Sequence, residues 1–274
     1  PEPFEFGIFR VNHDAAEALG AESLKEETSL NASAGFAITP AENFNLAVDA
    51  FFIDLDDRIV MTTELSGEEV EAVLRSSGEP SVVAVRYMTN AIHTETKGVD
   101  VTASYRFPLA EVGTLDLSGY YNYTDNKVFD DEIQTPPELQ GKDVALFDYA
   151  FEGGLLAMTK ERPRWRGGFS ALFTGARLSL TGKAHLYGPY RSTLYSYDAG
   201  AEQKFGEEVL FDAEIGYRLP RGVKLAIGAK NLFDNYPDLL NEDNGFLVFP
   251  YPPASPFGYN GRYVYARAEV RFGR

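Results

Sequence analysis

Three histidines, His13, His93 and His185, are the side chains of this 274-residue chain whose type most often serves in acid–base catalysis or metal binding. They lie far apart in sequence, so no His-Glu-x-x-His zinc motif and no Ser-His-Asp arrangement is present. The chain has no cysteine, which excludes disulfides, thiolate zinc sites and cysteine nucleophiles. The sequence therefore indicates no catalytic residue, no metal site and no cofactor.

An acidic run, Asp54-Leu-Asp-Asp57, has the oxygen ligands that Ca²⁺ prefers. In an extended strand, however, Asp54 and Asp56 share one face while Asp57 points to the other. Only two carboxylates then converge. The run is better interpreted as a solvated strand end near an aqueous rim.

Tyrosine and arginine gather in residues 187–207, and both residue types are favoured at recognition surfaces. For Tyr187 the alternatives are a ring of aromatics at a membrane interface or ligand contact. For Tyr190 and Arg191 they are ligand contact or loop packing, and Tyr195 and Tyr197 belong to the same cluster. The weak substrate-binding candidates are Tyr190, Arg191, Tyr187 and His185.

These residues are carried by strands, because apolar and polar side chains alternate with period two from about Leu30 to Phe272. Pro and Gly separate several of the alternating segments. The pattern predicts nine antiparallel strands near 29–38, 44–61, 83–105, 114–125, 164–174, 177–187, 208–219, 223–232 and 262–272.

The more apolar face of the seven clearest strands carries no charged residue, whereas the opposite face does. His185 falls on a polar face beside Thr181 and Lys183, which predicts that it faces an aqueous interior. A membrane barrel presents such apolar faces to lipid and polar faces to its lumen. The residues expected to face lipid include Val99, Val101, Leu115, Leu117, Leu178, Leu180, Ile215 and Ile227.

A soluble β-sandwich also alternates in this way, but the connections favour a barrel. Turns after the first, third, fifth and seventh strands are short, and the connections after the other strands are long. Outer-membrane barrels pair short periplasmic turns with long extracellular loops. The long connections also hold most of the acidic excess: residues 62–82 have five acidic residues and one basic, and residues 233–261 have four acidic and none basic.

The net charge of −16 disfavours nucleic-acid binding, which needs a basic surface. No run of about 18 apolar residues marks a transmembrane helix, and no signal peptide is visible. We expect residues 1–28 to form the tail of an extracellular loop or a partial strand, and residues 29–274 to form the barrel portion. Within the loops, the segment Gly67–Gly78 has helical spacing and predicts a short helix.

Five passages resemble the C-terminal part of the TonB-dependent receptor barrels of Gram-negative outer membranes. They occur in the family's order over nearly the whole chain. The passages are Ser29–Phe36 with Asn45–Ile59, Thr89–Val101, Pro163-Arg-Trp-Arg-Gly-Gly168, Ile227-Gly-Ala-Lys-Asn-Leu-Phe-Asp-Asn-Tyr-Pro237 and Pro256–Tyr263 with the terminal strand.

The resemblance implies about nine C-terminal strands of a 22-stranded barrel, with the plug domain absent from these residues. It implies energy-coupled uptake of a scarce large solute such as a ferric siderophore, a cobalamin-like compound or an oligosaccharide. The implied partners are outer-membrane lipid, a small-molecule ligand and the inner-membrane TonB energy-transducing complex, which acts through the missing N-terminal part.

Two other classes of protein remain as alternatives: a passive porin-like channel or self-closed small barrel, and a soluble secreted adhesin. A signal peptide and plug encoded upstream would favour the receptor. We also expect that these 274 residues alone do not transport solute selectively, because nine strands leave two unpaired edges and unpaired backbone groups are costly in hydrocarbon.

Overall fold

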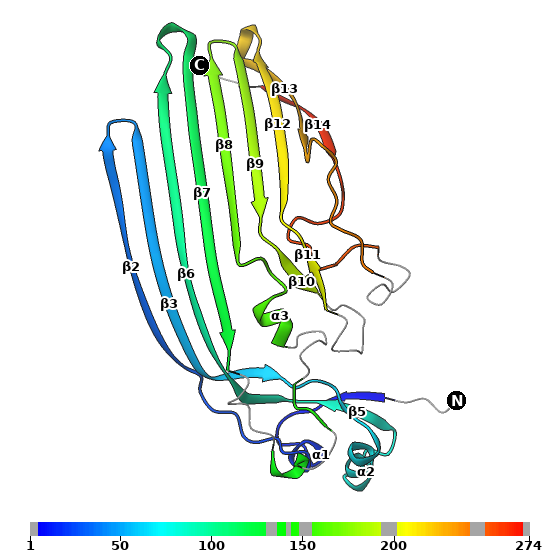
Figure 1. The fold of residues 1–274 in the computed structure, drawn as a ribbon. Coiled ribbons are helices and arrows are strands. Elements are labelled where there is room, and N and C mark those ends of the chain that lie inside the picture. The colour runs from blue at the N-terminus through cyan, green and yellow to red at the C-terminus, as the bar shows by residue number, and fades with distance from the viewer. Residues whose placement is uncertain are drawn as a thin grey trace.

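A computed structural model of the chain describes residues 5–129, 136–140, 144–147, 155–192, 202–241 and 250–270. Nine antiparallel strands form one meandering sheet, in the order β14-β13-β12-β9-β8-β7-β6-β3-β2 (Figure 1). Their bounds are β2 (Thr28–Ala41), β3 (Phe44–Met61), β6 (Met88–Pro108), β7 (Gly113–Val128), β8 (Trp165–Gly175), β9 (Leu178–Tyr187), β12 (Glu208–Arg218), β13 (Val223–Lys230) and β14 (Tyr263–Val270). The predicted antiparallel meander is confirmed. No helix among the described residues is long and apolar enough to cross a membrane.

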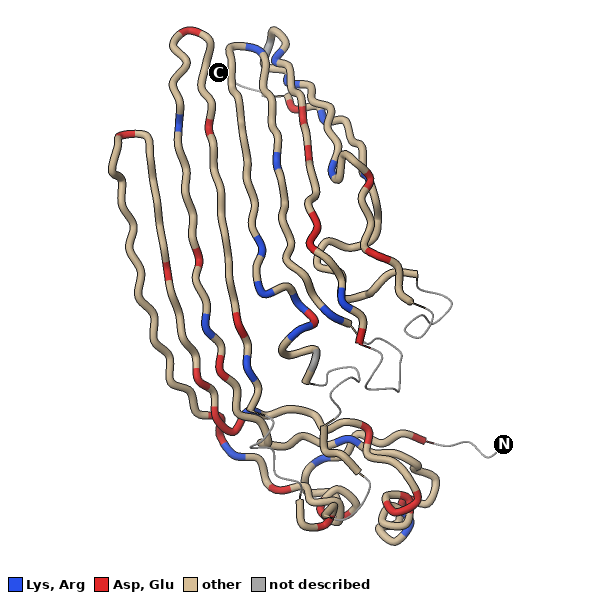
Figure 2. Tube along the Cα trace, viewed as in Figure 1, with Lys and Arg blue, Asp and Glu red and all other residues tan. Residues whose placement is uncertain are grey.

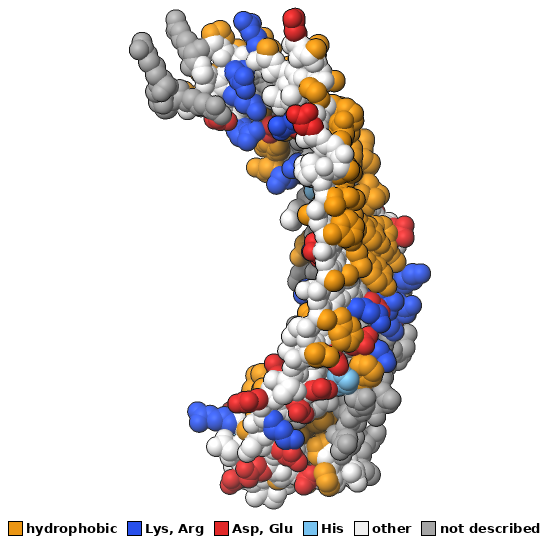
Figure 3. Space-filling view, turned by 90° about the vertical axis from the view of Figure 1, so that its left-hand side faces the viewer, with side chains coloured by type: hydrophobic (Ala, Val, Ile, Leu, Met, Phe, Trp, Pro, Cys, Tyr) orange, Lys and Arg blue, Asp and Glu red, His pale blue; other side chains and the backbone are white. Residues whose placement is uncertain are grey.

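The register confirms the predicted apolar face, because residues paired directly across an antiparallel ladder lie on the same side of a sheet. Leu180 pairs with Phe173 on one side and Ile215 on the other, and Ile215 pairs with Ile227. In the side view of Figure 3 the hydrophobic side chains form a band along the convex side of the molecule. We call this side the outer face and the opposite side the inner face.

Tight connections lie at one end of the sheet, as the connection lengths predicted. Two contain a 3-10 turn, η1 (Ala110–Val112) and η4 (Pro220–Gly222). Ala110 and Gly222 both adopt a positive φ there, which lets the chain reverse within a few residues. In Figure 1 these turns lie at the end opposite the N-terminal segments.

A small folded layer, here called the cap, covers the other end of β3 and β6. It comprises residues 5–27, 62–87 and the described parts of 136–147. Its elements are β1 (Glu5–Ile8), α1 (Asp14–Glu17), β4 (Leu65–Ser66), α2 (Glu68–Ser76), β5 (Val82–Arg86) and η3 (Pro137–Leu139). The predicted helix within 67–78 is confirmed, with Val70 and Leu74 fully buried on its inner side.

The prediction of one strand over 83–105 is wrong. Residues 82–86 leave the main sheet and form β5, which pairs with β1 in parallel and with β4. The reason is burial: Val82, Val85 and Tyr87 enter the core of the cap, where Tyr87 is 0% exposed. The Tyr87 hydroxyl donates a 2.8 Å hydrogen bond to the carbonyl of Leu19, so the phenol is buried without losing its polar partner.

Candidate functional site

His185 lies on the inner face of β9. Its Nε2 is 3.1 Å from Oδ2 of Asp212 on β12. The other carboxylate oxygen of Asp212 accepts a 2.9 Å hydrogen bond from the backbone N–H of Asn231. The contact therefore links β9, β12 and the end of β13.

Tyr187 lies on the same face as His185, two residues closer to the long connections. It is paired with Arg166 on one side and Glu208 on the other. Its ring is 5.4 Å from that of Phe257, in the connection that leads to β14. The register thus separates Tyr187 from the outer-face aromatics, where the rings of Tyr121 and Trp165 stack 6.2 Å apart.

Tyr190 and Arg191 lie in a two-stranded hairpin of β10 (Tyr190–Ser192) and β11 (Gln203–Phe205). Tyr190 is 3% exposed and stacks on Phe205 at 4.8 Å. Burial raises the pKa of Tyr190 to about 12, and the nearby Ser255 side chain opposes part of that shift. Tyr190 is thus a packing residue in this conformation, while Arg191 forms an ion pair with Glu202. Tyr195 and Tyr197 lie outside the described residues.

A basic pocket of about 240 Å³ adjoins this hairpin. The residues before β8 and the two hairpin strands supply its walls. Five of its seven lining residues are cationic, although the chain as a whole has a charge of −16. The lining residues are Lys160, Arg162, Arg164, Pro189, Tyr190, Arg191 and Lys204. Of the four candidates, the pocket brings together Tyr190 and Arg191 but not His185 or Tyr187.

The segment Asn231–Pro237 holds the connection after β13 against neighbouring strands. Asn231 and Asp234 both have positive φ, a conformation that Asn and Asp tolerate better than most residues. The Asn235 side chain donates to Glu208 Oε1 at 2.8 Å and to the Val209 carbonyl at 3.1 Å. Asp234 Oδ1 accepts a 2.6 Å hydrogen bond from the backbone N–H of Arg262. Two passages that carried the family resemblance are thus in direct contact.

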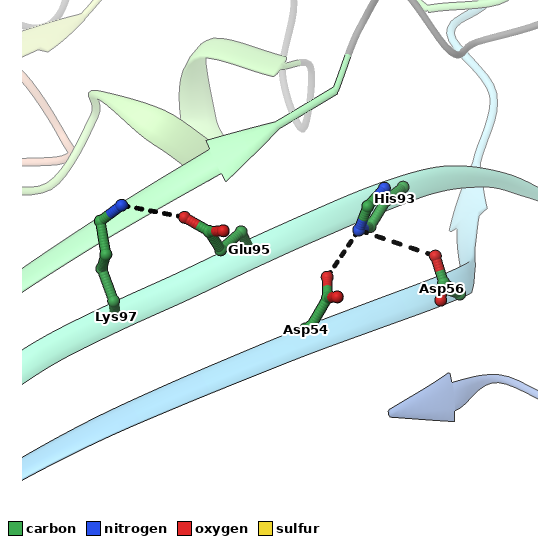
Figure 4. Close-up of polar contacts among 5 residues, drawn as sticks. All are labelled: Asp54, Asp56, His93, Glu95 and Lys97. Atoms are coloured by element: carbon green, nitrogen blue, oxygen red, sulfur yellow. Dashed lines mark hydrogen bonds and ion pairs between the residues drawn. The ribbon is translucent and has the colours of Figure 1, made fainter. Parts of the chain in front are cut away.

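A second polar cluster, absent from the sequence-based candidates, lies at the cap end of β3 and β6 (Figure 4). His93 Nε2 is 2.6 Å from Asp54 Oδ1 and 3.6 Å from Asp56 Oδ1. His93 also stacks on Phe129 at 4.2 Å. Alternation placed Asp54 and Asp56 on one face, but only the register of β3 against β6 brings His93 to them. Among the described residues, no three His, Asp or Glu side chains are arranged to hold a metal ion.

His93 and Asp56 also line a polar cavity of about 750 Å³ between the cap and the sheet. Asn90 closes one side of it, accepting a 2.7 Å hydrogen bond from the N–H of Lys25 and donating to the carbonyls of Lys25 and Asp57. The cavity joins residues more than sixty positions apart in sequence. For that reason local sequence patterns did not reveal it.

A curved antiparallel meander with an uncharged, apolar band on its outer face, tight turns at one end and folded connections at the other is the wall of a transmembrane β-barrel. The family "TonB dependent receptor-like, beta-barrel" matches residues 6–232. The chain belongs to this family, whose barrels lie in the outer membrane of Gram-negative bacteria.

Several solved structures share the fold at low sequence identity. The outer membrane transporter YddB from Escherichia coli is 10% identical, with a TM-score of 0.58 over 91% of this chain and 33% of that protein. The ferric enterobactin receptor PfeA from Pseudomonas aeruginosa is 19% identical, with a TM-score of 0.56 over 89% and 31%. The ferric yersiniabactin uptake receptor FyuA from Yersinia pestis is 16% identical, with a TM-score of 0.53 over 90% and 30%. The chain spans about a third of each, and no curated protein matches it.

Proposed function

We propose that this chain forms part of the wall of an outer-membrane receptor that takes up a scarce large solute by energy-coupled transport. The observation that carries the proposal is the match of residues 6–232 to the TonB-dependent receptor barrel. The proteins of similar fold include receptors named for ferric enterobactin and ferric yersiniabactin. A ferric siderophore is accordingly the first solute class to test, followed by cobalamin-like compounds and oligosaccharides.

The open sheet favours a wide receptor over a small self-closed pore. β2 and β14 occupy opposite ends of the strand order and do not pair with each other. An unpaired strand edge leaves N–H and C=O groups unsatisfied, which hydrocarbon does not tolerate. In a bilayer both edges therefore need further strands, and barrels of about 22 strands have a lumen wide enough to be filled by a plug.

His185 and Tyr187 are our proposed solute contacts from the wall, because both lie on the inner face close to the folded connections. Arg191 is the proposed rim contact. Tyr190, packed against Phe205, would support the position of Arg191 rather than contact solute. The inner-membrane TonB complex is the proposed energy source, acting through a domain outside these residues.

Uptake by cells that produce the receptor from its complete gene tests the proposal. Radiolabelled ferric siderophores, cobalamin and an oligosaccharide would be supplied at low concentration with and without an uncoupler of the inner membrane. We expect accumulation of one solute class that stops with the uncoupler while surface binding persists. Uptake that continues with the uncoupler would identify a passive channel instead.

The site is tested separately by His185→Ala combined with Tyr187→Ala. Thr181→Ala, on the same face of β9 but nearer the tight turns, is the matched control. Weaker surface binding of the transported solute by the double variant, with unchanged binding by Thr181→Ala, would support His185 and Tyr187 as solute contacts. Equal binding in all three proteins would remove His185 and Tyr187 from the site.

A further inference from the structure

A row of polar side chains crosses four strands on the inner face. Asp100 on β6 pairs with Asn122 on β7, and Asn122 pairs with Arg166 on β8. Arg166 pairs in turn with Tyr187 on β9, the wall residue proposed above as a solute contact. Directly paired residues lie on one side of a sheet, so these four side chains form one continuous line. In Figure 2 an acidic position on β6 and a basic position on β8 lie at similar height, with uncharged residues of β7 between them.

The row borders a pocket of about 510 Å³ in the inner face. Asp100, Asn122 and Arg166 line this pocket together with Thr102 and Tyr120. All of these side chains except the half-buried Asn122 are exposed. The pocket is therefore open to the lumen, and its polar groups are accessible to a solute there.

The pocket lies in the outer part of the wall. Tyr121 and Tyr123 occupy the same stretch of β7 on the opposite, outer face, and Tyr121 stacks on Trp165. Aromatic residues of this kind mark the boundary between hydrocarbon and headgroups. A solute that enters from the side of the long connections therefore reaches the pocket early.

Tyr120 supplies the pocket with an exposed aromatic surface. It pairs with Gly168 of β8, and its ring lies over that glycine: a Cβ at Gly168 would be 2.4 Å from Cε1 and 2.8 Å from Cζ of the ring. The absence of a side chain at Gly168 thus lets the ring lie along the wall. The ring remains 47% exposed, so it presents an apolar surface with a hydroxyl at its tip to the lumen.

Hydrogen-bond acceptors and donors lie side by side in the row. Asn122 Nδ2 donates a 2.6 Å hydrogen bond to Oδ1 of Asp100, which orients that carboxylate and leaves its other oxygen to accept from a ligand. Within the described residues Arg166 forms no side-chain hydrogen bond and no ion pair, so its N–H donors are available. The hydroxyls of Thr102 and Tyr120 can both donate and accept. A sugar hydroxyl also donates and accepts, and it is satisfied best where both kinds of partner are present.

The charge of the pocket favours a neutral solute over an ionic one. Asp100 and Arg166 are the only charged residues among the described residues that line it, and their charges cancel. An anion attracted by Arg166 would also meet the carboxylate of Asp100, and a cation attracted by Asp100 would meet the guanidinium. A neutral solute with many hydroxyls uses both groups without this conflict.

We propose that this pocket binds a carbohydrate, with one sugar ring stacked on Tyr120 and its hydroxyls hydrogen-bonded to Asp100 and Arg166. Tyr187, next in the row and 5.4 Å from the ring of Phe257, offers a second aromatic surface to an adjoining sugar unit. The inference rests on the proposed uptake function and selects an oligosaccharide from the solute classes named there. A fold shared with siderophore receptors at 16% and 19% identity does not determine the solute.

The test uses the complete receptor in detergent, screened against an array of neutral oligosaccharides that differ in sugar and linkage. The oligosaccharide bound most tightly is then titrated by fluorescence anisotropy. We expect Tyr120→Ala and Arg166→Gln each to weaken its binding about tenfold, whereas Tyr120→Phe, which keeps the ring, should lose less. Tyr123→Ala is the matched control, because it removes an exposed ring from the outer face of the same strand. Its affinity should equal that of the unaltered receptor.

The outcomes separate this inference from the proposed uptake function. If no oligosaccharide binds, the sugar pocket is refuted, and energy-dependent accumulation of a ferric siderophore would then leave the uptake function standing. Binding that is unchanged by Tyr120→Ala and Arg166→Gln would place the sugar elsewhere, and an equal loss in Tyr123→Ala would attribute the effect to the fold. If binding depends on Tyr120 but uptake continues with the uncoupler, the pocket is supported and energy coupling is refuted.

Discussion

The ring of Tyr265 on β14 lies across Gly228 of β13, and the three residues Glu214, Gly228 and Tyr265 form one cross-strand row on the inner face. Through this gap the Tyr265 hydroxyl donates a 2.9 Å hydrogen bond to Glu214 Oε2 on β12. Arg267 binds the other oxygen of Glu214 at 2.7 Å. A strand with no side chain at one position thus lets its two neighbours interact directly.

Gly228→Leu should break this row. A Cβ at Gly228 would lie 2.7 Å from the Tyr265 ring and 2.9 Å from the carbonyl oxygen of Ala213, so ring and strand must both shift. We expect a loss of about 1–3 kcal/mol in the free energy of unfolding, measured by urea titration in lipid vesicles. Gly182→Leu is the control, because nothing lies within 4 Å of a Cβ at that position. Similar losses in both variants would show that the contact across Gly228 is not the cause.

Leu117→Arg should destabilise the barrel, whereas Ser118→Arg should not. Leu117 pairs with Tyr105 and Ala171 on the outer face, and Ser118 pairs with Ser104 and Ser170 on the inner face. A charge at mid-depth in lipid costs about 2–4 kcal/mol, while the lumen is polar. The same urea titration measures both. Equal costs would mean that the two faces are wrongly assigned.

Asn90→Ala should release the segment that leads from the cap into β2. The Asn90 side chain makes both hydrogen bonds to the backbone of Lys25 and a 2.6 Å bond to the carbonyl of Asp57, which has a positive φ. Loss of these bonds costs about 1–3 kcal/mol of local stability. Trypsin cleavage after Lys25 should therefore accelerate in the folded receptor.

Asn31→Ala is the control for that experiment, since the Asn31 amide hydrogen bonds only to Ser29 among the described residues. Its cleavage rate should match that of the unaltered protein. A rate in Asn90→Ala that also stays unchanged would show that the segment is held by other contacts.

Tyr87→Phe should change how the stability of the cap responds to alkaline pH. Burial raises the pKa of Tyr87 above its ordinary value, with the Glu138 carboxylate adding to the shift. A raised pKa means that the folded state favours the neutral phenol. The contribution of this buried neutral phenol to the stability of the folded state is complete below about pH 10. It is lost as the pH rises through the folded-state pKa.

At neutral pH the variant loses the hydrogen bond to Leu19, a cost of about 1 kcal/mol. Above about pH 10 the unaltered protein should lose stability while the variant does not, so the difference should shrink or reverse. Denaturant midpoints of both proteins across this range provide the measurement. Parallel curves would contradict the assignment of this alkaline transition to Tyr87.

Alternation along the chain was enough to predict the nine strands, because the two faces of a strand meet different solvents. Leu115, Leu180 and Ile215 could be assigned to the lipid side without knowing which residues they pair with. The connection lengths were likewise enough to predict that the long connections lie together at one end of the sheet. The prediction failed at Val82–Arg86, where an apolar alternating segment pairs with β1 and β4 in the cap instead of joining the main sheet.

Partners across the sheet were decided only by the tertiary structure. A period of two is unchanged when a strand slides by two residues. The alternation therefore assigns Asp54 to one face of its strand, but it does not show that His93 of the neighbouring strand lies beside Asp54. The same holds for Arg164, whose Nε lies 3.2 Å from Oδ1 of Asp125. The sequence left ligand contact and loop packing open for Tyr190. The structure buries it against Phe205, and the sequence could not decide this because burial in a loop depends on what folds over it.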